Sequence, residues 1–155
     1  MSATGLDVFD KTLQTTNIWL NEISDEIGPD RQIAWKVLST VLHKLRDRLP
    51  IELSAQLGSQ LPLLIRGVYY DQFEPAKQPT DCNTTEEFAA EVAEWLSDIR
   101  PVDPDLAVAA VFGGLSRHLS EGQIAKVRNA LPKGLRSSWE SIEARQSSAA
   151  EPVGA

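Results

Sequence analysis

The sequence is poor in the side chains from which most catalytic and metal sites are built. It holds one cysteine, Cys82, and two histidines, His43 and His118, among 155 residues. A single cysteine cannot form an internal disulfide or a four-cysteine zinc site. The neighbouring acid Asp81 disfavours the thiolate form of Cys82, and the thiolate is the reactive form. We therefore predict no disulfide and no cysteine-based catalysis.

Long apolar runs are missing as well. No stretch approaches the roughly 20 apolar residues that span a bilayer. The first seven residues lack the basic region followed by an apolar region that marks a signal peptide. We therefore expect a cytoplasmic protein with no membrane association.

The patterns that mark enzymes and cofactor sites are also missing. Glu87, Glu91 and Glu94 share helical spacing, but no Glu-x-x-His motif accompanies them, as a di-iron bundle requires. Gly113-Gly114 falls inside a helical pattern, where it favours close helix crossing over phosphate binding. His43 and His118 are predicted at boundary or surface positions. We predict no catalytic, cofactor-binding or metal-binding residue, and no enzymatic activity.

Charge is unevenly distributed along the chain. The net charge of −7 disfavours nucleic-acid binding, because phosphate contacts need a concentrated positive surface. Residues 84–105 are acidic and residues 117–136 are basic. The acids are Glu86, Glu87, Glu91, Glu94, Asp98, Asp103 and Asp105, and the bases are Arg117, Lys126, Arg128, Lys133 and Arg136. Two solvated helix faces explain this pattern; an acidic docking surface or head-to-tail association into a homo-oligomer is the alternative.

Apolar residues recur at intervals of three and four along the chain, which predicts an all-α protein. The first stripe ends at Gly28-Pro29, and Pro50 and Pro62 stand where later helices begin. Thr84 to Glu87 reads as a capping box, and Asp103-Pro104 as a cap followed by a first-turn proline. The stripes are Phe9, Leu13, Thr16, Leu20, Ile23 and Ile27; Ile33 to Leu49; Leu53 and Leu57; Leu61, Leu64, Ile65 and Val68; Phe88, Val92, Leu96 and Ile99; Leu106 to Leu119; Ile124 and Val127; and Leu135, Trp139 and Ile142.

The helical pattern occurs twice. A shift of 70 positions pairs Leu61-Pro62 with Leu131-Pro132 and Arg66 with Arg136, and a shift of 76 pairs the first helices. We predict a single domain, 1–155, with one four-helix unit at 5–70, a linker at 71–83, a second unit at 84–145 and a disordered tail at 146–155. The two units would form one bundle with a shared core and a pseudo-two-fold axis.

One series of motifs resembles a known family. The residues are His43-Lys-Leu-Arg-Asp-Arg-Leu-Pro50, Ala55-Gln-Leu-Gly-Ser-Gln-Leu-Pro62 and Leu64-Ile-Arg-Gly-Val-Tyr-Tyr70. They resemble the bacterial domain-of-unknown-function family numbered 2267, over roughly residues 5–145. In the second unit Ser120 replaces the first proline and Ser137-Ser138-Trp139 replaces Gly-Val-Tyr. The resemblance implies an all-helical, cytoplasmic bacterial protein and brings no activity, cofactor or catalytic residue.

Aromatic residues indicate where a partner would dock. Trp19 and Trp95 match in the repeat, and Trp139 matches Tyr69, so we expect all three tryptophans to be structural. Trp35 has no aromatic counterpart and is a candidate contact residue. The remaining candidates lie around the end of the first unit and are Arg66, Tyr69, Tyr70 and Phe73. They are candidates because arginine and aromatic side chains anchor interfaces. The alternative is that these aromatics only pin the linker to the bundle.

Three functions fit the sequence. The first is a non-enzymatic interaction or adaptor module with an unidentified protein partner. The second is a small-ligand-binding or stress-response domain with a pocket between the units. The third, disfavoured by the acidic total, is a regulator that binds nucleic acid through residues 117–136.

Overall fold

The computed structural model describes residues 3–80, 84–99 and 101–150, and within these ranges every regular element is helical. The α-helices are α1 (Asp7–Ile27), α2 (Arg31–Arg48), α3 (Ile51–Gln60), α4 (Leu63–Tyr70), α5 (Thr85–Trp95), α6 (Pro104–His118), α7 (Glu121–Ala130) and α8 (Lys133–Ala150), with one 3-10 turn at Pro75–Lys77. The predicted all-α class is therefore confirmed. None of the helices in the described ranges is long and apolar enough to cross a membrane.

Side chains at the helix starts explain several of the boundaries. The Asp30 carboxylate accepts hydrogen bonds from two backbone N–H groups at the start of α2, and Asp103 caps α6 in front of Pro104. The Thr84 hydroxyl accepts the N–H of Glu87 at 3.0 Å, as the capping box predicts. Each cap satisfies N–H groups that a helix leaves without internal partners.

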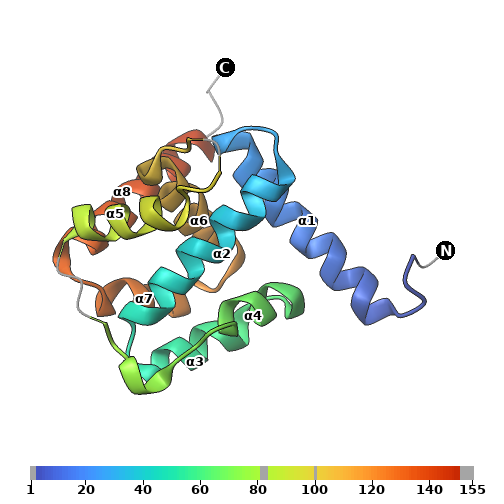
Figure 1. Ribbon diagram of the computed structural model, residues 1–155, viewed down its shortest axis with the longest axis horizontal. Coiled ribbons are helices and arrows are strands. Elements are labelled where there is room, and N and C mark those ends of the chain that lie inside the picture. The colour runs from blue at the N-terminus through green and yellow to red at the C-terminus, as the bar shows by residue number, and fades with distance from the viewer. Residues whose placement is uncertain (1–2, 81–83, 100, 151–155) are drawn as a thin grey trace.

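Helices α2 and α6 lie at the centre of the bundle (Figure 1). Helix α2 contacts α1, α4, α5 and α6, while α6 contacts α1, α2, α5, α7 and α8. Phe112 of α6 stacks on Trp139 of α8 with ring centroids 4.1 Å apart, and both side chains are fully buried. The buried residues form one continuous apolar core to which both halves of the chain contribute.

Several local contacts recur at the 70-residue spacing. In α4, the Arg66 guanidinium donates to the carbonyls of Ser59 and Leu61. In α8, the Arg136 guanidinium donates to the carbonyls of Asn129 and Leu131. In both halves, therefore, an arginine one turn into the helix that follows Leu-Pro binds the last carbonyls of the preceding helix.

The structure differs from the predicted boundaries at two places. Helix α8 continues to Ala150, so residues 146–150 of the predicted disordered tail are helical, and residues 151–155 lie outside the described ranges. Neither glycine nor proline interrupts the chain between Gly134 and Pro152, so nothing stops the helix earlier. Helix α5 ends at Trp95, one turn before the predicted end, and residues 96–98 form a turn.

Candidate functional site

Tyr69, a predicted partner contact, is fully buried. Its hydroxyl donates to the carbonyl of Ser54 at 2.7 Å, which joins α4 to α3. Burial raises the pKa of Tyr69 above its ordinary value, so the phenol stays protonated. Because no part of the ring reaches the surface, Tyr69 supports the bundle and cannot itself contact a partner in this structure.

Tyr70 and Phe73 are half-buried and hold the segment that follows α4. The Tyr70 ring packs edge-on against Tyr69 and Phe73, with centroid distances of 5.0 and 5.8 Å. The Arg46 guanidinium carbon lies 5.3 Å from the centre of the Phe73 ring. These contacts correspond to the alternative interpretation, in which the aromatics pin the linker to the bundle.

Arg66 and Trp35, the other two candidates, lie apart from each other. Arg66 is half-buried and donates to two carbonyls at the end of α3, as described above. Trp35 is half-buried and packs against the core from α2. The structure thus gives four of the five candidates an internal packing or hydrogen-bonding role at the end of the first unit, and places Trp35 elsewhere.

The predicted linker is attached to the C-terminal end of α2. The Gln78 amide nitrogen lies 2.7 Å from the carbonyl oxygens of both Arg46 and Leu49. The Thr80 backbone N–H donates to the carbonyl of Asp47 at 2.7 Å. A helix leaves its last carbonyls without internal partners, so the linker satisfies groups that α2 exposes. Residues 81–83, which include Cys82, lie outside the described ranges.

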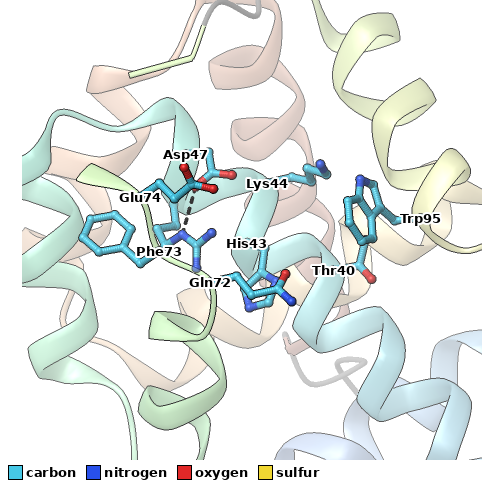
Figure 2. Close-up of a pocket in the computed structure, with 9 residues that line it drawn as sticks. Thr40, His43, Lys44, Asp47, Gln72, Phe73, Glu74 and Trp95 are labelled. Carbon is cyan, nitrogen blue, oxygen red and sulfur yellow. Dashed lines mark hydrogen bonds and ion pairs between the residues drawn. The ribbon is translucent and has the colours of Figure 1, made fainter. Parts of the chain in front are cut away.

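A cleft of about 470 Å³ opens between α2, the linker and the end of α5. Figure 2 shows Trp95 and Phe73 at opposite ends of the cleft, with His43 and Lys44 of α2 between them. Trp95 is 52% exposed, which corrects the expectation that it is structural like Trp19. The physical reason is that the two rings are covered differently. His118 stacks on the Trp19 ring, whereas the flexible Lys44 side chain places its ammonium over Trp95, 4.7 Å from the centre of the ring.

The polar groups in this cleft are largely engaged. His43 Nε2 lies 2.5 Å from the carbonyl oxygen of Val68, so this nitrogen carries the hydrogen. Burial lowers the pKa of His43, which favours the neutral imidazole. Arg46 donates to the carbonyls of Tyr69 and Asp71 and pairs with Asp47. The described residues contain no group of three or more His, Cys, Asp or Glu side chains that could hold a metal ion.

A second candidate surface lies between α1 and α4. The N-terminal half of α1 extends away from the rest of the bundle (Figure 1). Beside α4 it encloses a groove of about 340 Å³, which we call the α1–α4 groove. The groove is lined by Thr4, Phe9, Thr12, Leu13, Leu63, Leu64 and Gly67, and an adjoining hollow of about 320 Å³ includes Val8.

The α1–α4 groove is mainly apolar and open to solvent. Its large apolar side chains, with Val8 beside them, are between 39% and 56% exposed. They are Val8, Phe9, Leu13, Leu63 and Leu64. Other exposed apolar side chains, such as Ile18, Ile51 and Leu106, line neither the groove nor the adjoining hollow. Contiguous apolar patches of this kind mark interaction sites, whereas single exposed residues do not.

Sequence reasoning missed the groove because it assigned three of its apolar residues to the core and made no assignment for Leu63 or Val8. Phe9 and Leu13 continue the buried stripe of α1, and Leu64 fits the stripe of α4. One signal in the sequence could have indicated that this apolar surface does not belong to the shared core. Seventy positions after Leu63 and Leu64, the chain has Lys133 and Gly134, so the apolar pair is peculiar to the first half.

The two charged segments form ion pairs with other parts of the chain. In the acidic segment, Glu91 pairs with Arg48 and Asp98 lies 3.7 Å from Lys36. In the basic segment, Arg117 pairs with Glu22, and Arg128 with Glu143. These ion pairs neutralise part of the charge of the acidic and the basic segment.

Comparisons with known proteins locate the chain at family level. The search of curated proteins finds no match. The model of the family described as "Uncharacterized conserved protein (DUF2267)" matches residues 16–138, which include most of α1 and the whole of α2 to α7. The chain therefore belongs to the DUF2267 family of uncharacterised conserved proteins.

Proposed function

We propose that this chain is a non-enzymatic protein-interaction module of the bacterial cytoplasm, and that its partner docks in the α1–α4 groove. In this proposal the scaffold is a tandem duplication of a four-helix unit around a pseudo-two-fold axis. The arginine contacts that recur at the 70-residue spacing support that origin. The single observation that carries the docking site is the group of five half-exposed apolar side chains at the groove.

The energetics of burial favour a bound partner. Burying the exposed half of a leucine or phenylalanine side chain contributes on the order of 1 kcal/mol. Leu63, Leu64, Leu13 and Phe9 together would therefore supply several kcal/mol, enough to offset part of the entropy lost on association. A groove between two helices fits an amphipathic helix, which places apolar anchors at intervals of three and four residues.

Affinity capture with the full-length protein tests this proposal. Immobilised wild type should retain a specific partner identified by mass spectrometry, and Leu63→Lys/Leu64→Lys should lose it because two lysines replace the apolar wall. Ile51→Lys is the matched control: Ile51 is 46% exposed at the start of α3 and lies outside the groove. Equal retention by wild type and the double variant would contradict the docking site, and turnover of any substrate by the pure protein would contradict the non-enzymatic role.

A second candidate function is small-ligand binding in the cleft of Figure 2. The half-exposed Trp95 favours it, because a large apolar ring bordering a cleft provides a stacking surface. Native mass spectrometry of the purified protein should then detect a bound small molecule in wild type that Trp95→Ala does not retain. Spectra of the bare chain alone for wild type would count against this candidate.

The nucleic-acid alternative receives less support. Arg117 and Arg128, in the basic segment, pair with carboxylates of the same chain, so part of the positive surface is neutralised. Phosphate binding requires basic groups that release counterions from the nucleic acid. A shift of any duplex at low salt would revive this alternative.

A further inference from the structure

We infer that the occupant of the α1–α4 groove is helix α1 of a second copy of this chain, an inference that rests on the proposed function. The chain carries both halves of such a contact. The N-terminal half of α1 is an amphipathic helix end that extends from the bundle, and the same half forms one wall of the groove. A two-fold axis would let each copy insert its α1 beside α4 of the other, so that every contact is made twice.

The floor of the groove has room for an incoming side chain. Gly67 lies in α4 between the exposed leucines and the end of the helix, and a Cβ placed there would have nothing within 4 Å. Val8 and Phe9 of the second copy are the apolar side chains at the extending end of α1, with exposures of 56% and 47%. An apolar side chain that enters this space replaces water and contacts Leu13 and Leu64.

The apolar area is of the size that self-association requires. Five large side chains that are about half exposed present roughly 400 Å² of apolar surface per chain. A standard interface buries about 800 Å² per partner, of which a little more than half is apolar. The groove therefore provides the apolar centre of such an interface, and the polar groups around it provide the rim.

The charge around the groove also suits a second copy. A chain with a net charge of −7 repels its own copies at most orientations. Beside the groove, however, one acid and one base are present: Asp10 accepts hydrogen bonds from Thr4, which lines the groove, and Lys11 lines the adjoining hollow. An interface between identical surfaces is least unfavourable where acids and bases are equal in number.

The bundle itself does not need the exposed leucines. Helix α8 starts after Leu131-Pro132 as α4 starts after Leu61-Pro62, yet its first residues are Lys133 and Gly134. A helix of this kind therefore forms without leucine at its first two positions. The exposed parts of Leu63 and Leu64 are therefore available for a contact that the single chain does not make.

Light scattering coupled to size-exclusion chromatography tests the inference on the full chain. With rising concentration, the wild-type mass should move from 17.1 kDa toward twice that value. Leu63→Lys/Leu64→Lys should stay at the monomer mass. Ile18→Lys, at a 51% exposed position of α1 outside the groove, should behave as wild type.

A second variant keeps the test decisive if the double variant folds poorly. Gly67→Gln removes no apolar side chain and places a polar one in the open floor, so it should retain the helical circular dichroism of wild type and stay monomeric. A wild type that remains at 17.1 kDa at every concentration would overturn the inference. A dimer that persists in both Gly67→Gln and the double variant would overturn it equally.

The inference and the proposed function fail in different ways. Suppose that the wild type is monomeric and captures a different protein, which Leu63→Lys/Leu64→Lys loses and Ile51→Lys retains. This result would overturn the inference that the occupant is a second copy, but the groove would remain the docking site. A monomeric wild type whose captured proteins are unaffected by the double variant overturns both.

Discussion

The backbone N–H of Leu64 donates to the hydroxyl of Thr12 across 3.0 Å, and this bond joins α4 to the extending half of α1. The N–H belongs to the first turn of α4, where a helix has no internal acceptor. Thr12 therefore acts as a cap supplied by another helix. Its hydroxyl also sets the position of the α1–α4 groove, because Thr12 and Leu64 both line it.

Thr12→Val should weaken this connection. Valine has the shape of threonine but cannot accept a hydrogen bond, so we expect a loss of about 0.5–1.5 kcal/mol in the free energy of unfolding. Urea denaturation followed by circular dichroism measures it. Thr15→Val is the matched control, since the Thr15 hydroxyl donates only to the carbonyl of Lys11 in its own helix. Equal losses in the two variants would argue against an interhelical role for Thr12.

Tyr69 and Tyr70 are neighbours that donate to carbonyls of the same helix, α3, in different environments. The Tyr69 hydroxyl is buried and bonds to Ser54 at 2.7 Å, whereas the Tyr70 hydroxyl reaches Ala55 at 3.3 Å near solvent. Tyr69→Phe should cost about 1–2 kcal/mol, because it leaves a buried carbonyl without this donor. Tyr70→Phe should cost well under 1 kcal/mol, since water replaces the lost bond. Thermal unfolding of the two variants should rank them in this order; the reverse order would contradict the assigned burial.

Two glycines should respond in opposite directions to alanine. A Cβ at Gly67 in α4 meets nothing within 4 Å, so Gly67→Ala should stabilise the helix by up to about 1 kcal/mol. A Cβ at Gly58 would lie within 3 Å of the Tyr70 ring and closer still to its hydroxyl, so Gly58→Ala should destabilise by about 1–3 kcal/mol. Chemical denaturation monitored by tryptophan fluorescence compares them. Stabilisation by both substitutions would mean that Tyr70 does not pack on α3.

His43 should make stability fall in mild acid. Burial lowers the pKa of His43 in the folded protein below its unfolded value of about 6.5. The unfolded chain then binds more protons in this range, so the free energy of unfolding decreases as the pH falls from about 7 toward 5. His43→Gln removes this titration while an amide N–H can still reach the Val68 carbonyl. The difference in unfolding free energy between wild type and His43→Gln should shrink with falling pH; a difference that is constant with pH would contradict the assignment.

Local chemistry explains why the helices could be predicted from the sequence. Thr84 and Asp103 cap the helices that follow them, and Pro50 and Pro62 stand immediately before α3 and α4. These signals act within one helical turn, so they do not depend on distant parts of the chain. The apolar stripe of α2 was predictable for another reason: it runs from Ile33 to Leu45 at helical spacing, and α2 packs on four other helices that bury it.

Cover by distant elements explains why the candidate site could not be predicted. Periodicity indicates which face of a helix is apolar, but not how much of that face a neighbour covers. Helix α1 has 21 residues and is about 31 Å long, whereas α4 has 8 residues and is about 12 Å long. The stripe of α1 is therefore buried at Trp19 and Ile23 and open at Phe9. The same reason explains why the exposure of two aromatic residues could not be predicted. Trp95 is half-exposed and Tyr69 is buried because of the side chains that other helices place over them.

The central claim is that the α1–α4 groove is where this chain meets its partner, and amide hydrogen exchange tests it most directly. The exchange of the protein is compared between dilute solution and the associated state, formed either at high concentration or with a captured partner. We predict that protection rises in residues 6–13 and 63–67, and that Leu63→Lys/Leu64→Lys abolishes the rise. Protection confined to residues 72–74 and 95, at the cleft of Figure 2, would contradict the claim and assign the interaction to that cleft.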